Sequence, residues 1–233
     1  MRITILGSAA GGGFPQWNCN CRNCAGVRSG AVRAKSRTQS SIFVRPDDGD
    51  DGILFNASPD ILQQIRANPL LQPARRVRDT AIAAVVLIDG QVDHATGLLM
   101  LRERGSALPL WCADPVAEDL SSGLPLLRVL DHYCGVQRQR IPLDGATFEV
   151  PGVPTLTLRA LPLSSKAAPY SPLRCRSSDQ TTSMSSMSAG SLPRLAACCG
   201  KCARGEPRPF SSALTRWPLT RCPASRGRRW QGC

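Results

Sequence analysis

The sequence predicts a layered domain of the α/β or α+β class, followed by an unstructured tail. Short β-branched runs come first along the chain, and later runs alternate with segments of helical composition, which is typical of strands packed against helices. Val and Ile are absent after residue 173, where Ser, Arg, Pro and Cys dominate. We therefore predict a domain over residues 1–173 and a basic, low-complexity tail over residues 174–233.

Three strands are expected first, at residues 3–6, 40–44 and 53–56, because each is a short apolar or β-branched run bounded by turn residues. A helix is expected next, with Ser58 as its N-cap and Pro59 in its first position. Further helices are expected at residues 95–102, 114–120 and 124–133, and further strands at residues 108–112, 138–141, 146–150 and 155–161.

A continuous apolar run at residues 83–88 predicts a strand buried on both faces. Its carboxyl end, where layered α/β folds carry functional loops, leads to Asp89 and then to Asp93 and His94. A carboxylate and an imidazole suit a borderline metal such as Zn²⁺ or Fe²⁺. The alternative is that His94 caps a helix whose first turn holds Asp93, and Asp60 and Asp89 can equally be helix-terminus charges.

Cys19, Cys21 and Cys24 place three thiols within six residues, close enough to bind one metal ion. The alternative is a set of reduced structural cysteines, and a redox pair is disfavoured because a helix-opening Cys-x-x-Cys context is lacking. The glycine-rich segment at residues 7–13 matches no phosphate-binding fingerprint, so a tight crossover is favoured over nucleotide binding. The candidates for a fourth ligand are His132, Cys112, Cys134 or a tail cysteine.

The net charge of +12 lies mostly in the tail. Residues 174–233 hold 11 Lys and Arg against 2 Asp and Glu, or +9, which leaves 18 against 15, or +3, for residues 1–173. This distribution disfavours nucleic acid as a partner of the domain.

Eleven cysteines in a chain of 233 residues can suggest a secreted disulfide framework. The apolar run at residues 3–6 is too short for the core of a signal peptide, and no run approaches the roughly 18 apolar residues of a membrane span. We therefore expect a protein of the reducing cytoplasm, without a membrane span, in which clustered cysteines bind metal.

Residues 1 to about 173 resemble the coenzyme PQQ synthesis protein B family, which is part of the metallo-β-lactamase superfamily. The resemblance covers about three quarters of this chain and a little over half of a full family member. It is specific because many separate segments match in order. These segments are residues 5–21, 37–41, 56–61, 72–75, 78–80, 93–97 and 169–172.

The resemblance implies a metallo-β-lactamase-like αββα sandwich, present here in its N-terminal part only, with a metal site at one sheet edge. The superfamily's His-x-His-x-Asp-His motif falls on residues 89–94. Asp93 and His94 keep its last two ligands, whereas Asp89 and Gln91 stand where the first two histidines would be. The resemblance also implies that Cys19, Cys21 and Cys24 bind a structural zinc, completed by a histidine from the C-terminal half.

For function, the resemblance implies biosynthesis of pyrroloquinoline quinone (PQQ). The expected role is an oxygenase or hydroxylase that uses iron or another divalent metal on a tyrosine-derived precursor, with other PQQ biosynthesis proteins as candidate partners. One alternative is a carrier of the quinone or its precursor toward the periplasm, with Arg37, Arg75 or Arg78 pairing with carboxylates. Another is a metal-dependent phosphodiester hydrolase, which the missing histidines disfavour.

The tail holds six cysteines and no histidine, unlike the second half of the family. It is either a natural disordered basic tail or the product of a reading frame that shifted near residue 174, since a GC-rich gene read out of frame yields this composition. We favour the shifted frame. Because the remaining ligands are missing, we expect that the chain as written does not fold into a competent enzyme.

Overall fold

A computed structural model describes residues 1–164, 167–172 and 182–189. The chain divides into two units, Met1–Cys202 and Ala203–Cys233. The second unit lies wholly outside the described residues. Within the predicted tail, residues 174–233, the structure describes residues 182–189, which form one strand.

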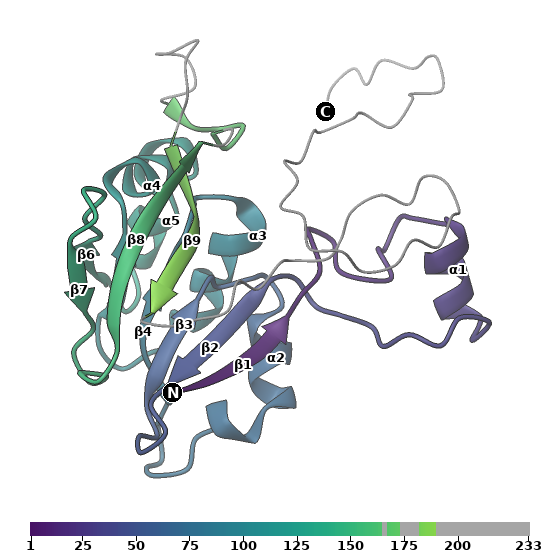
Figure 1. The fold of residues 1–233 in the computed structure, drawn as a ribbon, viewed down its shortest axis with the longest axis horizontal. Coiled ribbons are helices and arrows are strands. Elements are labelled where there is room, and N and C mark those ends of the chain that lie inside the picture. Colours follow the sequence, from purple (N-terminus) through teal and green to yellow (C-terminus); the bar gives the residue numbers. More distant parts are fainter. Residues whose placement is uncertain (165–166, 173–181, 190–233) are drawn as a thin grey trace. The chain divides into compact units, whose positions relative to one another are not determined.

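The larger sheet contains six strands in the order in which they occur along the chain (Figure 1). The first two pairings are antiparallel and the next three are parallel. The strands confirm the runs expected from the sequence to within a few residues. They are β1 (Arg2–Gly7), β2 (Ser41–Arg45), β3 (Gly52–Phe55), β4 (Ile82–Val86), β5 (Leu108–Cys112) and β6 (Val136–Arg140).

The second sheet is antiparallel and contains β7 (Thr147–Glu149), β8 (Thr157–Ser164) and β9 (Thr182–Ala189). Side chains on one face of β8, Leu158 and Ala160, belong to the same buried cluster as Phe43, Leu54 and Val85 of the larger sheet. The two sheets therefore share one hydrophobic core, as in a β-sandwich.

The helices are short and lie in the connections between strands. The 3₁₀ and π turns extend several of them. The elements are α1 (Arg22–Arg28), α2 (Ile61–Ala67), η1 (Pro69–Leu71), α3 (Val92–Ala95), η2 (Thr96–Leu101), α4 (Asp114–Glu118), η3 (Asp119–Gly123) and α5 (Leu126–Leu130).

The start of α2 corrects the sequence prediction. The helix begins at Ile61, and Ser58 is not its N-cap: the Ser58 carbonyl accepts the Ile61 N–H at 3.0 Å, while its buried hydroxyl has no hydrogen-bond partner among the described residues. Asp60 stands in the N-cap position but its carboxylate accepts from Gln39 instead, through the backbone N–H at 2.9 Å and the side-chain amide at 3.1 Å. Packing against a neighbouring segment thus replaces local capping.

The helix expected at residues 95–102 is also corrected, because η2 is a 3₁₀ turn that follows the four-residue helix α3. The Gly97 N–H donates to the carbonyl of Ala57 at 2.9 Å rather than to the preceding turn. This contact interrupts the α-helical hydrogen-bond ladder where α3 ends.

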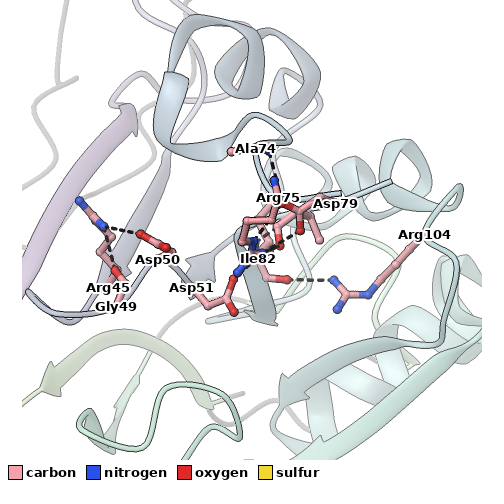
Figure 2. Close-up of polar contacts among 10 residues, drawn as sticks. Arg45, Gly49, Asp50, Asp51, Ala74, Arg75, Asp79, Ile82 and Arg104 are labelled. Atoms are coloured by element: carbon pink, nitrogen blue, oxygen red, sulfur yellow. Dashed lines mark hydrogen bonds and ion pairs between the residues drawn. The ribbon is translucent and has the colours of Figure 1, made fainter. Parts of the chain in front are cut away.

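An ion cluster ties the loop before β4 to the turn before β3 (Figure 2). The Arg75 guanidinium lies between two carboxylates, with Nη2 2.9 Å from Asp51 Oδ1 and 2.8 Å from Asp79 Oδ1. In the same view, Arg104 donates to the carbonyl of Ile82, the first residue of β4, at 2.9 Å. These contacts lie at the amino ends of β3 and β4, away from the edge to which β4 delivers Asp89.

Among the described residues, none of the helices combines the length and apolar composition that crossing a bilayer requires. Within the same ranges no disulfide joins the cysteines, which are Cys19, Cys21, Cys24, Cys112 and Cys134.

Candidate functional site

The main candidate site begins where β4 ends. Four of the five β4 residues are buried, which confirms the strand expected from the apolar run. The chain leaves β4 through a turn at Asp89 and Gly90 and enters α3. This helix is a single turn of four residues, and it carries both Asp93 and His94. Asp89 Oδ1 accepts the N–H of Gln91 at 3.0 Å. The side chain of the first residue in the turn therefore stabilises the turn through a hydrogen bond to the backbone two residues later.

Two carboxylates flank the His94 imidazole on opposite sides. Asp89 Oδ1 lies 2.7 Å from Nδ1, and Asp93 Oδ2 lies 4.0 Å from Nε2. The three side chains are between 16% and 23% exposed, so the imidazole is largely shielded but still reachable. Burial alone would lower the pKa of His94, but the Asp89 hydrogen bond and the charges of Asp89 and Asp93 outweigh it and raise the pKa.

This arrangement suits a divalent metal. With Nδ1 engaged by Asp89, a neutral His94 presents its Nε2 lone pair beside the Asp93 carboxylate. A carboxylate that orients a ligating histidine in this way is a recurring feature of metal sites. Asp93 and His94 therefore fit a metal, with Asp89 as the orienting group rather than a ligand in place of the first histidine.

The segment after β3 forms hydrogen bonds with α3 and with the residues that lead into it. Asn56 adopts a left-handed conformation with φ of 60°, and its side-chain oxygen accepts the N–H of Ile88 at 3.3 Å. The next residue, Ala57, donates its N–H to the carbonyl of His94 at 2.8 Å. A Cβ on Gly97 would lie 2.1 Å from the carbonyl oxygen of Ser58, so only glycine permits this close approach.

The glycine-rich segment after β1 borders the same site. A Cβ on Gly11 would lie 3.4 Å from Asp93 Oδ2, which places the Gly11 backbone beside the candidate ligand. Gly12 donates its N–H to Gln39 Oε1 at 3.2 Å, and Gln39 in turn holds Asp60. Asp60, considered in the sequence analysis as a helix-terminus charge, does stand at the start of α2, but its carboxylate binds Gln39 and does not cap the helix.

Sequence reasoning missed two further residues near the site. Asp119, the first residue of η3, is 6% exposed, and one of its carboxylate oxygens has no hydrogen-bond partner among the described residues. Tyr170 donates its hydroxyl to the carbonyl of Gly90. Tyr170 lies in the family-matching segment 169–172, to which the sequence analysis gave no functional role, and no sequence signal separates Asp119 from other acids.

The pKa values of Asp119 and Tyr170 are both raised. Burial is the largest cause, and with the charges of Asp89 and Glu118 it raises the pKa of Asp119, although the nearby Ser171 hydroxyl opposes the shift. Burial and the charges of Asp119, Asp89 and Asp93 raise the pKa of Tyr170 to about 12. Tyr170 is therefore protonated at neutral pH and serves as a hydrogen-bond donor.

The second candidate site is the cysteine cluster. The sulfur atoms of Cys19, Cys21 and Cys24 all lie within 4.8 Å of one another, which fits three thiolates around one zinc. Arg28, the last residue of α1, holds the surrounding loop by donating to the carbonyl of Cys19 at 2.6 Å and to that of Gln16.

The fourth ligand is not found in the part of the chain that the structure describes. There, no further histidine, cysteine or carboxylate joins the three sulfurs, so Cys112, Cys134 and His132 do not complete the site. The tail cysteines lie outside the described residues.

One argument against a redox pair was wrong. Cys21 occupies the N-cap position of α1, which carries Cys24, so the Cys21-x-x-Cys24 segment does open a helix. The prediction failed because residues 27–39 are basic and polar and show no clean helical period, so no helix was expected to begin at Arg22.

The arginines considered for anion binding have structural contacts. Arg75 lies between Asp51 and Asp79 (Figure 2), and Arg78 donates to the carbonyl of Glu103 at 3.3 Å. The Arg37 guanidinium lies 4.7 Å from the centre of the Phe14 ring and borders an open depression of about 280 Å³ beside β1 and α2.

A family model described as a beta-lactamase superfamily domain matches residues 52–195, more than half of the chain. The chain therefore belongs to the β-lactamase superfamily. Together with the mixed sheet, this match confirms the predicted metallo-β-lactamase fold.

Within the superfamily, the resemblance to coenzyme PQQ synthesis protein B is confirmed. The chain is 63% identical to that protein from Azoarcus sp. (strain BH72) over 174 residues, which is 75% of this chain and 57% of that protein. It is 64% identical to the Cupriavidus necator protein over 172 residues, or 74% of this chain and 56% of that protein. This chain thus spans little more than half the length of these relatives.

A solved structure supports the same resemblance. The crystal structure of Zn²⁺-bound PqqB from Methylobacterium extorquens matches with a TM-score of 0.64 and 40% identity, over 81% of this chain and 58% of that one.

Proposed function

We propose that this chain carries the N-terminal part of a protein of pyrroloquinoline quinone biosynthesis. The observation that supports this most is the orientation of His94 by Asp89, with Nε2 facing Asp93, in a chain that is 63% identical to coenzyme PQQ synthesis protein B. The candidate site lies at the carboxyl end of β4, at the sheet edge where the metallo-β-lactamase fold is expected to hold its metal.

The reaction we propose is oxygenation or hydroxylation of a tyrosine-derived precursor, with iron held by Asp93, His94 and ligands outside the described residues. Bound ferrous iron would supply the activation of dioxygen. The chain's own residues prepare the site: Asp89 keeps Nδ1 engaged, and the Gly11 backbone borders Asp93. Other PQQ biosynthesis proteins are the proposed partners, in the cytoplasm, where clustered thiols stay reduced.

We further propose that Cys19, Cys21 and Cys24 bind a structural zinc. The spacing of their sulfur atoms supports this, and the similar M. extorquens protein binds Zn²⁺ in its crystal structure. Structural zinc sites contribute directly to local folding. Zinc here would fix the loop that leads from the glycine-rich segment into α1.

An intact relative, such as the Azoarcus protein, provides the test. We expect oxygen consumption that requires ferrous iron and a tyrosine-derived precursor, and that is lost when the residues matching Asp93 and His94 are replaced by Ala. Zinc in place of iron serves as the metal control. Binding of the quinone without oxygen consumption would support a carrier instead, and cleavage of a phosphodiester without oxygen would support a hydrolase.

A further inference from the structure

We propose that Tyr170 is a positioning residue that fixes the Asp89–Gly90 turn and thereby holds His94 in the tautomer with a bare Nε2. The proposal rests on the proposed role of His94 as a metal ligand, because it explains how the chain prepares that ligand before metal binds. Tyr170 acts through the backbone of Gly90 and does not itself touch the imidazole in any contact described above.

The first step is the contact between Tyr170 and the turn. The Tyr170 hydroxyl donates to the carbonyl of Gly90, a residue 80 positions earlier in the chain. Gly90 is buried, and a Cβ on it would lie 3.0 Å from the Cβ of Asp119. The Gly90 peptide is therefore held between the side chains of Asp119 and Tyr170, with no space to spare on the Asp119 side.

The second step is the anchoring of the tyrosine segment. Ala168 and Ser171 are 3% and 4% exposed, and the Ser171 N–H donates to the Ala168 carbonyl at 3.0 Å, which closes a turn around Tyr170. A Cβ on Gly123 would lie 2.1 Å from the Tyr170 carbonyl oxygen. The segment is therefore seated directly on the backbone at the end of η3.

The third step connects the turn to the imidazole. Asp89 Oδ1 accepts from both the Gln91 N–H at 3.0 Å and His94 Nδ1 at 2.7 Å, so the carboxylate can hold Nδ1–H only while the turn keeps its shape. The hydrogen bond on one ring nitrogen determines which nitrogen carries the proton. A relaxed turn would free Nδ1 and let the proton move to Nε2, the atom that faces Asp93.

The composition of the chain makes the test direct. It contains two histidines, His94 and His132, and two tyrosines, Tyr133 and Tyr170. We would record long-range ¹H–¹⁵N spectra of the metal-free chain with ¹⁵N-labelled histidine, in alkaline buffer where imidazoles are neutral. The two nitrogen shifts of each ring report its tautomer.

We expect His94 to show the Nδ1–H pattern in the wild-type chain. Tyr170→Phe should shift both His94 nitrogens toward the averaged values of mixed tautomers, and Asp89→Asn should do the same as a positive control. Tyr133→Phe is the matched control, because Tyr133 is 58% exposed and lies over Arg102. His132 should be unchanged in all variants. A His94 pattern that Tyr170→Phe leaves as in the wild type overturns the proposal.

If Tyr170→Phe unfolds the chain, a measurement on the wild-type protein tests the proposal instead. The Tyr170 hydroxyl proton should then exchange slowly with water, since it is bonded to Gly90, and a rapidly exchanging hydroxyl would overturn the proposal. Neither measurement requires iron, oxygen or substrate. A failure of the proposed oxygenase chemistry therefore leaves this result intact, and the reverse also holds.

Discussion

His94 is held by two carboxylates that act on different nitrogens. Asp89 engages Nδ1 at 2.7 Å and Asp93 approaches Nε2 at 4.0 Å. At position 89 a carboxylate replaces the histidine that the superfamily's motif would place there. In this geometry Asp89 orients His94, the ligand that we propose, and does not itself bind the metal, which favours a site with few protein ligands over a dinuclear hydrolase site.

Gly97, the second residue of η2, permits the close contact between the start of η2 and the segment after β3. Gly97→Ala would place a Cβ 2.1 Å from the Ser58 oxygen and 2.6 Å from the Ala57 oxygen. We expect it to lower the free energy of unfolding by about 1–3 kcal/mol, the usual cost of overpacking. The measurement is urea denaturation followed by tryptophan fluorescence, to which the buried Trp111 contributes together with the other three tryptophans of the chain.

Gly105→Ala is the matched control, because a Cβ there meets no atom within 4 Å. A shift as large for Gly105→Ala as for Gly97→Ala would show that loss of backbone freedom, and not the contact with Ser58, explains the effect.

At the scale of elements, Asp79 links the loop before β4 to the rest of the fold through Arg75. The Arg75 hydrogen bonds hold the pKa of Asp79 well below its usual range. A carboxyl whose folded pKa is depressed adds stability above the unfolded value of about 3.9, and that stability is lost as the pH falls through the folded pKa. We therefore expect Asp79→Asn to be less stable than wild type above about pH 4, with the difference shrinking toward stronger acid.

Thermal unfolding across the acid range would measure this. Asp50→Asn is the control, since Asp50 is 84% exposed and lies 3.9 Å from Arg45 (Figure 2). A difference between Asp79→Asn and wild type that stays constant with pH would contradict the assigned role of the carboxylate.

Helix α1 and the loop before it depend on the cysteine cluster in our proposal. With three thiolates and no fourth ligand among the described residues, we expect the purified chain to hold less than one zinc, and Cys24→Ala to lose most of what is held, because two thiolates remain where three bound. Metal content by mass spectrometry gives the stoichiometry. Cys134→Ala is the control because Cys134 lies outside the cluster, and equal zinc loss in both variants would refute the assignment.

The strands were predictable from sequence to a degree that the helices were not. β5 matches its expected run at both ends, and the buried β4 followed from an uninterrupted apolar run. The helices are four to seven residues long and were misplaced at Ser58 and at residues 95–102, because contacts from distant segments set their ends. Local patterns carry no information on such contacts.

The candidate site was predictable only in part for the same reason. Asp93, His94 and the three cysteines were identifiable by residue type and spacing. The pairing of Asp89 with His94 depends on the shape of one turn. Tyr170 reaches that turn from 80 residues away, so no local pattern could place it there.

At the scale of the whole molecule, we propose that the domain belonging to the family ends near residue 173. The Azoarcus and C. necator proteins align over 174 and 172 residues, although the family model extends to residue 195 and β9 pairs with β8 beyond residue 173. Translating the gene after codon 173 in the other two frames tests this. A frame that restores an apolar α/β pattern with histidines would show that the tail is out of frame, and its absence in both frames would contradict the proposal.

The same proposal predicts an incompetent enzyme. With Asp93 and His94 as its proposed ligands, we expect the purified chain to bind ferrous iron weakly and to show no turnover of precursor, and we expect an intact relative to do both. Iron content after gel filtration and oxygen uptake measure this. Stoichiometric iron retained through a cooperative unfolding transition would contradict it.

The strand order of the larger sheet has a consequence for biosynthesis of the chain itself. Because β1 to β6 lie side by side in the order of the sequence, each strand can pair with one that left the ribosome before it. Such a sheet can assemble progressively during translation, with little waiting for distant partners. All six strands precede residue 141, so the assembly of this sheet requires no strand from the tail.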